Sequence, residues 1–155
     1  MRAPDLRQTL MDALSKTGRA SSDYDLNKDV VLPEGRKLTP ASVLIAVRLD
    51  TGNVILTKRS AKLKHHPGQI AFAGGKQDAS DVDAIAAALR EASEEIGLMP
   101  DCVEVLGTLP AHETVTGYVV TPVIALVHGP FDPVPEAGEV SEVFEVPLTH
   151  FAAPA

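Results

Sequence analysis

The segment from residue 81 to residue 98 constrains the fold more than any other, because it joins an apolar stripe to a concentrated acidic face. Apolar residues recur there at steps of three and four, the period of a helix with one buried side. They are Ile85, Ala88, Leu89, Ala92 and Ile96. Asp78 and Ser80 are candidate N-caps, and Gly97 follows as a helix stop. We therefore predict a helix over residues 81–96 that buries this stripe.

A different side of this helix carries Glu91, Glu94 and Glu95, with Arg90 as the only cation in the segment. The three glutamates are neighbours on the helix surface, where like charges destabilise a helix by about 0.2–0.5 kcal/mol per pair. Helix geometry alone leaves two interpretations open. The face is either solvated, as most charge runs are, or it binds divalent cations, which prefer oxygen ligands.

Two glycines, Gly74 and Gly75, precede the predicted helix. A glycine pair lets the backbone approach a ligand closely or expose a carbonyl group, although it also occurs in ordinary tight turns. A glycine loop, an acidic residue and a helix carrying Arg-Glu-x-x-Glu-Glu form a more specific pattern than either half alone. The combination favours the cation site.

The remaining segments read mainly as strands. A strand pair is expected over residues 42–60 around a turn at Gly52, and a short strand runs into the glycine loop. Further strands are expected over residues 102–109, 118–127 and 140–148. Pro122 suggests an edge position or a bulge in the second of these. Strands and helices out of strict alternation favour an α+β fold or an α/β/α sandwich over a parallel βαβ array.

The length of 155 residues predicts a single domain. Residues 1–40 are expected to hold a short amphipathic helix, ending near Gly18, and an irregular connector, and residues 41–155 the core. The helical spacing at the N-terminus comes from apolar side chains: Leu6, Leu10, Met11 and Leu14.

Composition limits the partners. The net charge of −7 argues against a general nucleic-acid surface. Cys102 is the only cysteine, which excludes an internal disulfide and fits a reducing cytoplasm. No apolar run approaches the roughly 20 residues that span a bilayer. We therefore expect a cytoplasmic protein with a small-molecule substrate and no nucleic-acid or membrane partner. The oligomeric state stays open, with a homodimer as one option.

At the glycine pair and the acidic helix, the chain resembles the Nudix hydrolases. Their sequence box reads Gly-x5-Glu-x7-Arg-Glu-U-x-Glu-Glu-x-Gly-U, where U is a bulky apolar residue. Gly75 and the run from Arg90 to Leu98 match, with the small Ala92 at one U position. Asp81 replaces the first glutamate, and the box is one residue longer than the general pattern. The role of Asp81 therefore stays open.

Residues 56–75 resemble the signature of the coenzyme A pyrophosphatase branch of this family, which also has the lengthened box with aspartate. Lys64 replaces an arginine of that signature, keeping the charge but losing the planar fork that grips phosphate. Ala73 replaces a proline. The positions that match are Thr57, Arg59, Ser60, Gly68, Phe72, Gly74 and Gly75.

The resemblance implies a Nudix α/β/α sandwich with a mixed sheet. It also implies hydrolysis of coenzyme A, or of its derivatives, to 3′,5′-ADP and 4′-phosphopantetheine with Mg²⁺ or Mn²⁺. Glu91 and Glu95 would bind the metal directly, Glu94 directly or through water, and the Gly74 carbonyl would complete the shell. Arg90 would orient a glutamate.

The substrate phosphates would face a group of cations and a glycine: Lys58, Arg59, Lys64 and Gly75. The general base in this superfamily is often an acidic residue outside the box. Glu136, Glu139 and Glu142 are the candidates, and Glu139, at the end of its loop, is the first choice. The catalytic set is then Arg90, Glu94, Glu95 and Glu139.

Two alternatives remain open. The chain could act on another nucleoside diphosphate derivative, such as ADP-ribose, a dinucleotide or an oxidised nucleoside triphosphate. It could also be a Nudix fold kept as a non-catalytic binding module, although such modules commonly lose the box glutamates, which are all present here. Relatives in the coenzyme A branch usually continue beyond the segment at 140–148. The core over residues 41–155 is therefore expected to be C-terminally incomplete or completed by a partner.

Overall fold

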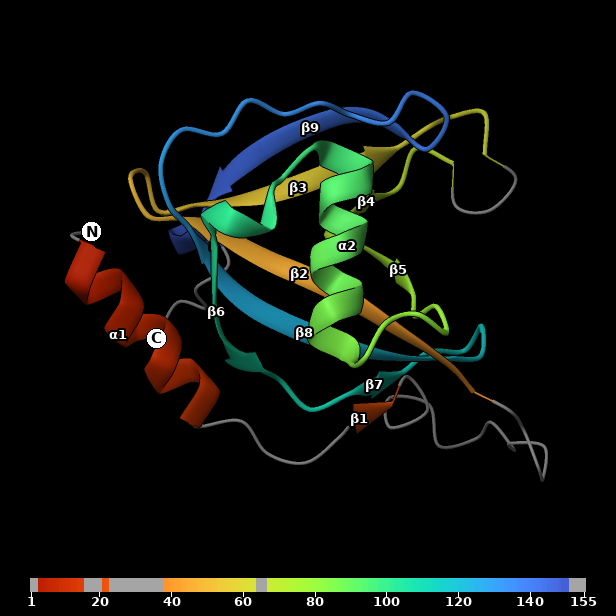
Figure 1. Cartoon of the computed structure of the whole chain (residues 1–155), viewed down its shortest axis with the longest axis horizontal. Helices are drawn as coiled ribbons and strands as arrows, with labels where there is room; N and C mark the ends of the chain where they lie inside the picture. Colours follow the sequence, from red (N-terminus) through yellow and green to blue (C-terminus); the bar gives the residue numbers. More distant parts are fainter. Residues whose placement is uncertain (1–2, 16–20, 23–37, 64–66, 151–155) are drawn as a thin grey trace.

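The computed structural model describes residues 3–15, 21–22, 38–63 and 67–150 (Figure 1). It contains a mixed nine-stranded sheet, helix α1 (Ala3–Ser15) and helix α2 (Ala84–Ile96). None of the helices in the described ranges is long and apolar enough to cross a bilayer. The connector predicted over residues 19–40, and Gly18 before it, fall largely outside these ranges.

The strands are β1 (Ser21–Ser22), β2 (Thr39–Arg48), β3 (Asn53–Arg59), β4 (Ile70–Ala71), β5 (Ala73–Lys76), β6 (Val103–Thr108), β7 (His112–Glu113), β8 (Tyr118–Val127) and β9 (Val140–Pro147). Strand β2 lies at the centre, parallel to β8 and antiparallel to β3 and β5. Strands β6 and β7 pair with β8, and β9 pairs with β3. Short 3₁₀ helices cover Pro100–Cys102 and Leu148–His150.

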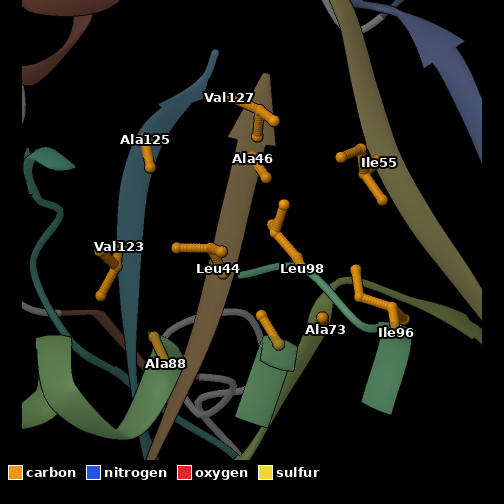
Figure 2. Close-up of a cluster of buried hydrophobic side chains, with 11 residues drawn as sticks. Leu44, Ala46, Ile55, Ala73, Ala88, Ile96, Leu98, Val123, Ala125 and Val127 are labelled. Atoms are coloured by element: carbon orange, nitrogen blue, oxygen red, sulfur yellow. The ribbon is translucent and has the colours of Figure 1, made fainter. Parts of the chain in front are cut away.

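Successive residues of a strand point to opposite sides, so the sheet has two apolar faces. Each face is covered by a helix. On one face, Leu44 of β2 packs in a cluster with Ile96 of α2 (Figure 2). On the other face, Leu6 and Leu10 of α1 pack in a second cluster with Val47 of β2. Each large aliphatic side chain buried in this way contributes about 1.5–3 kcal/mol. The two clusters confirm the predicted α/β/α sandwich.

Helix α2 buries the predicted stripe. Ala88, Ala92 and Ile96 are buried, and Ile85 and Leu89 are partly buried against the same cluster. The glutamates lie on another side of the helix, and Glu91 lies beside Gly75 of β5.

The N-terminus of α2 differs from the prediction, whereas the C-terminus agrees with it. The N-cap is Asp83, whose side chain accepts a hydrogen bond from the backbone of Ala86 at 2.8 Å. Asp78 and Ser80 lie before the helix in a turn closed by the Asp81 N–H to Asp78 carbonyl bond of 3.0 Å. Gly97 ends the helix with φ 73°, a left-handed conformation that favours glycine.

The predicted glycine loop is a strand. Gly74 and Gly75 lie in β5, in register with Val43 and Ser42 of β2. A Cβ atom at Gly74 would overlap the Ser42 carbonyl oxygen and lie 2.7 Å from the Cα of Val43. Glycine is needed here for close approach between two backbones and not for a turn.

The predicted edge position for Pro122 is wrong, because β8 is an interior strand. On one side Pro122 is in register with Val43 of β2. On the other side it falls between the stretches of β8 that pair with β6 and with β7. A proline is tolerated there because the ladder is already interrupted. A register shift does occur, but in the neighbouring strand, between Val105 and Gly107.

Candidate active site

A cavity of about 360 Å³ opens between α2, β5 and the start of β9. Two of its lining carboxylates, Glu91 and Glu95, come from α2, and a third, Glu139, comes from the loop before β9, far along the chain. A smaller cavity beside it, of about 30 Å³, shares Glu95, Glu139 and Arg59. We call the two together the acidic cavity. The larger part is lined by Arg59, Leu63, Gly74, Gly75, Lys76, Asp78, Glu91, Glu95 and Glu139.

Glu91 is held against β5. A Cβ atom at Gly75 would lie 2.9 Å from the Cδ of Glu91, so the carboxylate occupies space that only a glycine leaves open. Arg90 Nη1 donates to Glu91 Oε1 at 3.0 Å, and the Glu91 side chain is 17% exposed. The second glycine of the pair therefore makes room for an acidic side chain of the predicted site.

Glu95 is the most perturbed carboxyl group in this cavity. Burial, followed by its hydrogen bond to Glu91 and the negative charges of Glu91 and Glu139, raises the pKa of Glu95 to about 8. A hydrogen bond from the Gly74 backbone works in the opposite direction. A cation near this group would favour its ionised form, because opposite charges stabilise each other.

Arg90 joins the helix to β5 and to the turn before the helix. Its Nε and Nη2 each donate to Asp81 at 3.0 Å, a bidentate pair. Nη1 also donates to Glu94 at 3.1 Å, and Nη2 donates to the Lys76 carbonyl at 3.1 Å. The bonds to Asp81 are the largest of the effects that raise the pKa of Arg90. Arg90 therefore contacts Glu91 on one side and Asp81 on the other.

Sequence reasoning left the role of Asp81 open, and no local pattern could have assigned it. Its side chain is only 5% exposed, and it also accepts a hydrogen bond from the Asp78 backbone at 2.7 Å. The nine-residue separation from Arg90 matches no helical neighbour spacing. The contact depends on the turn that precedes α2, which the sequence pattern placed inside the helix.

Glu139 enters the cavity because its loop is fixed at both ends. The Glu136 N–H donates to the Glu95 carbonyl at 2.7 Å, which ties the loop to the end of α2. The Ser60 N–H donates to the Glu139 carbonyl at 2.8 Å, which ties it to the end of β3. The side chains of Glu136 and Glu142 are exposed and are absent from the residues lining the acidic cavity.

Three of the predicted site residues that the structure describes, Lys58, Arg90 and Glu94, do not line the acidic cavity. Glu94 has a side chain that is 61% exposed and is bound to Arg90. Lys58 is exposed on β3 and does not line this cavity. Lys64 lies outside the described residues. Arg59, in contrast, lines both parts of the cavity.

The donor set fits a hard divalent cation, since the converging side chains supply carboxylate oxygens. Within the described residues no group of three or more acidic, histidine or cysteine side chains already stands in the geometry of a metal centre. Glu91 is paired with Arg90 and hydrogen-bonded to Glu95. Cation binding would replace the hydrogen bond between the two carboxyl groups and relieve their repulsion.

Comparison with known proteins decides the family. A model described as "NUDIX domain" matches residues 38–155, more than half of the chain. The chain belongs to the Nudix family. This confirms the resemblance seen in the sequence at the level of the family, and Nudix hydrolases generally use divalent cations.

The relatives carry the same family name. A Citrobacter koseri protein described as "Uncharacterized Nudix hydrolase NudL" is 43% identical over 142 residues, which cover 91% of this chain and 70% of that protein. An Escherichia coli protein of the same description is 50% identical over 109 residues, covering 70% and 57%. The chain therefore spans little more than half of the length of some curated Nudix relatives.

A solved structure agrees on the fold. The structure described as a Caenorhabditis elegans Ap4A hydrolase binary complex has a TM-score of 0.60 and 18% identity, covering 70% of this chain and 80% of that one. At this identity the likeness concerns the Nudix fold alone.

An Asp81→Asn variant should change how folding depends on pH. Its hydrogen bonds with Arg90 hold the pKa of Asp81 below the ordinary 3.8. Stability from a lowered pKa is present above the unfolded-state pKa and is lost as pH falls through the folded one. We expect the wild-type free energy of unfolding to fall more steeply than that of the variant between about pH 5 and pH 2. Urea denaturation at a series of pH values measures both slopes, and equal slopes would contradict the assignment.

Proposed function

We propose that this chain hydrolyses the diphosphate bond of coenzyme A or its derivatives, producing 3′,5′-ADP and 4′-phosphopantetheine. The observation that carries the proposal is Arg59. It belongs to the segment that resembles the coenzyme A pyrophosphatase branch, and it lines the same cavity as Glu91, Glu95 and Glu139. A guanidinium group beside carboxylates suits a diphosphate, because the cation pairs with phosphate oxygens.

Other residues of that segment support its local structure. Thr57 Oγ1 donates to the Ala71 carbonyl at 2.9 Å, between β3 and β4. Ser60 is buried, and its hydroxyl accepts a hydrogen bond from the Lys62 backbone at 3.2 Å. Ala73, where the branch has proline, is buried in the core cluster, so this departure concerns packing. The segment therefore carries Arg59 at the cavity and holds the Glu139 backbone through the Ser60 N–H.

Glu91 and Glu95 would hold Mg²⁺ or Mn²⁺, with Glu94 acting through water from its exposed position and the Gly74 carbonyl as a further ligand. The proximity of Glu95 to the Gly74 backbone supports this last assignment. When bound, such a cation neutralises phosphate charge and activates water for attack on phosphorus. Arg90 and Asp81 keep Glu91 turned toward the cavity.

The protein's own groups complete the reaction. Water attacks one phosphorus atom, its oxygen forms the new bond, and the bridging P–O bond breaks. Glu139 accepts the proton of that water as general base. Arg59 pairs with phosphate oxygens, and the bridging oxygen leaves on the other phosphate. Gly75 leaves room beside β5 for the Glu91 carboxylate, next to the reacting diphosphate.

The test is a substrate panel with Mg²⁺: coenzyme A, ADP-ribose, a dinucleoside polyphosphate and a nucleoside triphosphate. We expect the highest kcat/KM for coenzyme A. A higher value for another compound would overturn the coenzyme A assignment and keep diphosphate hydrolysis. Absence of turnover with all four, using Mg²⁺ and then Mn²⁺, would favour a binding module.

Replacing Arg59 by alanine should slow the reaction with both coenzyme A and its 3′-dephospho form. A lost charged hydrogen bond to phosphate costs roughly 1.5–3 kcal/mol, or about one to two decades in kcat/KM. The two substrates should be affected equally, because Arg59 lies at the acidic cavity where the diphosphate reacts. The control is Lys62→Ala, which removes one exposed positive charge outside the lining residues. Unchanged rates for Arg59→Ala would contradict its role.

A further inference from the structure

A second and larger cavity, of about 630 Å³, adjoins the acidic cavity. Arg59, Gly75 and Lys76 line both, so the two spaces share one wall. A volume of this size is typical of sites for small organic ligands. A diphosphate that reacts in the acidic cavity would therefore extend one of its two substituents into this neighbouring space.

This second cavity differs chemically from the first. None of the described residues that line it carries a carboxylate, and one of them, Tyr118, is aromatic. The Lys76 ammonium lies over the Tyr118 ring, 5.9 Å from its centroid. The described residues that line it are Ala41, Arg59, Gln69, Ala71, Gly75, Lys76, Thr116 and Tyr118. An aromatic face next to a cation suits a planar base that carries a nearby negative charge.

The aromatic wall is pre-organised by its own turn. The Thr114 hydroxyl accepts a hydrogen bond from the Tyr118 backbone at 3.1 Å and is bonded to the Thr116 hydroxyl at 3.0 Å. The Thr39 N–H donates to the Gly117 carbonyl at 2.8 Å, which fixes the turn to the start of β2. Gly117 has φ 91°, a left-handed conformation that favours glycine. Tyr118 is thus held by backbone contacts on both sides, which lowers the cost of ordering it around a ligand.

Lys76 stands at the boundary between the cavities for a structural reason. Its carbonyl accepts the Arg90 hydrogen bond, and Ala41 is in register with it across β5 and β2. The backbone of Lys76 is therefore fixed by Arg90 and by pairing with β2, while its exposed side chain reaches the ring of Tyr118. With its ammonium over that ring, Lys76 is placed to meet a phosphate bound in the second cavity.

We propose that this second cavity binds the nucleoside half of the substrate, with the base against Tyr118 and a separate phosphate monoester paired with Lys76. The assignment rests on the proposed diphosphate hydrolysis and adds to it the recognition of a phosphorylated ribose. It gives Lys76 the specificity role, while Arg59 serves the diphosphate that all substrates of this class share.

The test measures binding by calorimetry with Mg²⁺, using 3′,5′-ADP and AMP as probes, which differ only in the 3′-phosphate. Wild-type protein should bind 3′,5′-ADP more tightly. Lys76→Ala should weaken 3′,5′-ADP binding about 10- to 100-fold and AMP binding less than about threefold. Tyr118→Ala should weaken both by about tenfold or more, and Tyr118→Phe, which keeps the ring, should stay within about threefold of wild type. Lys62→Ala, the matched charge control, should bind both as wild type does.

Three results would overturn the inference: equal wild-type affinities for the two nucleotides, equal losses for both in Lys76→Ala, or unchanged binding in Tyr118→Ala. Loss of 4′-phosphopantetheine binding in Tyr118→Ala, with nucleotide binding retained, would assign the cavity to the other half of the substrate and also overturn it. Failure of the proposed hydrolysis is seen separately, as absent turnover of coenzyme A, because nucleotide binding is measured without catalysis.

Discussion

A Glu95→Gln variant should hydrolyse coenzyme A at least about a hundredfold more slowly than the wild-type protein at saturating Mg²⁺. Changes to groups that only support a metal ligand already cost about 10–100-fold, so a direct ligand should cost no less. Glutamine keeps the shape of the side chain and removes the charge that the cation needs. Steady-state kinetics with a Mg²⁺ titration measures the loss in kcat and the expected weakening of metal binding.

The same variant should fold as well as wild type. Burial and the charges of Glu91 and Glu139 raise the pKa of Glu95 to about 8, so its ionised form is unfavourable in the folded, metal-free protein. A neutral amide removes that repulsion, and thermal unfolding in the presence of a chelator should show an equal or higher midpoint. Wild-type activity at saturating Mg²⁺ would contradict the metal assignment, whereas a large fall in the unfolding midpoint would mean that the activity loss reflects misfolding.

Glu139→Gln should reduce kcat by about 10²–10⁴-fold, the range for loss of a general base. Substrate and metal should still bind, because Arg59, Glu91 and Glu95 are unchanged, so KM should move much less than kcat. Rapid mixing of enzyme and coenzyme A, followed over a single turnover, separates the chemical step from product release.

Glu142→Gln is the matched control for the general base, since it removes an equivalent carboxylate from an exposed position three residues along the chain. Its kcat should remain within about twofold of wild type. If Glu142→Gln or Glu136→Gln loses activity and Glu139→Gln does not, the base has been assigned to the wrong residue of this loop.

The helix that carries the site could be predicted from local information. The apolar period of α2 requires only neighbouring residues, and Gly97 ends the helix through its own backbone freedom. The sandwich followed from the same logic, because an amphipathic helix and alternating strands must bury their apolar faces against each other. The start of α2 was less certain because several capping residues, Asp78, Ser80 and Asp83, compete within one turn.

The rest of the site depends on contacts between distant segments, which no local pattern contains. Gly74 and Gly75 read as a loop because glycine is a poor strand former, yet pairing with β2 holds them in β5. Arg90 reaches Asp81 through a turn, and Tyr118 meets Lys76 across the sheet. Lys58 does not line the cavity although the next residue, Arg59, does, because successive residues of a strand point to opposite faces.

The measurement that tests the central claim most directly is the fate of coenzyme A incubated with this protein and Mg²⁺ in water labelled with heavy oxygen. Mass spectrometry should find 3′,5′-ADP and 4′-phosphopantetheine in equal amounts, with one heavy oxygen in only one of the two products. A chelator should stop the reaction. Intact coenzyme A after prolonged incubation with either Mg²⁺ or Mn²⁺, or loss of the 3′-phosphate in place of diphosphate cleavage, would contradict the account.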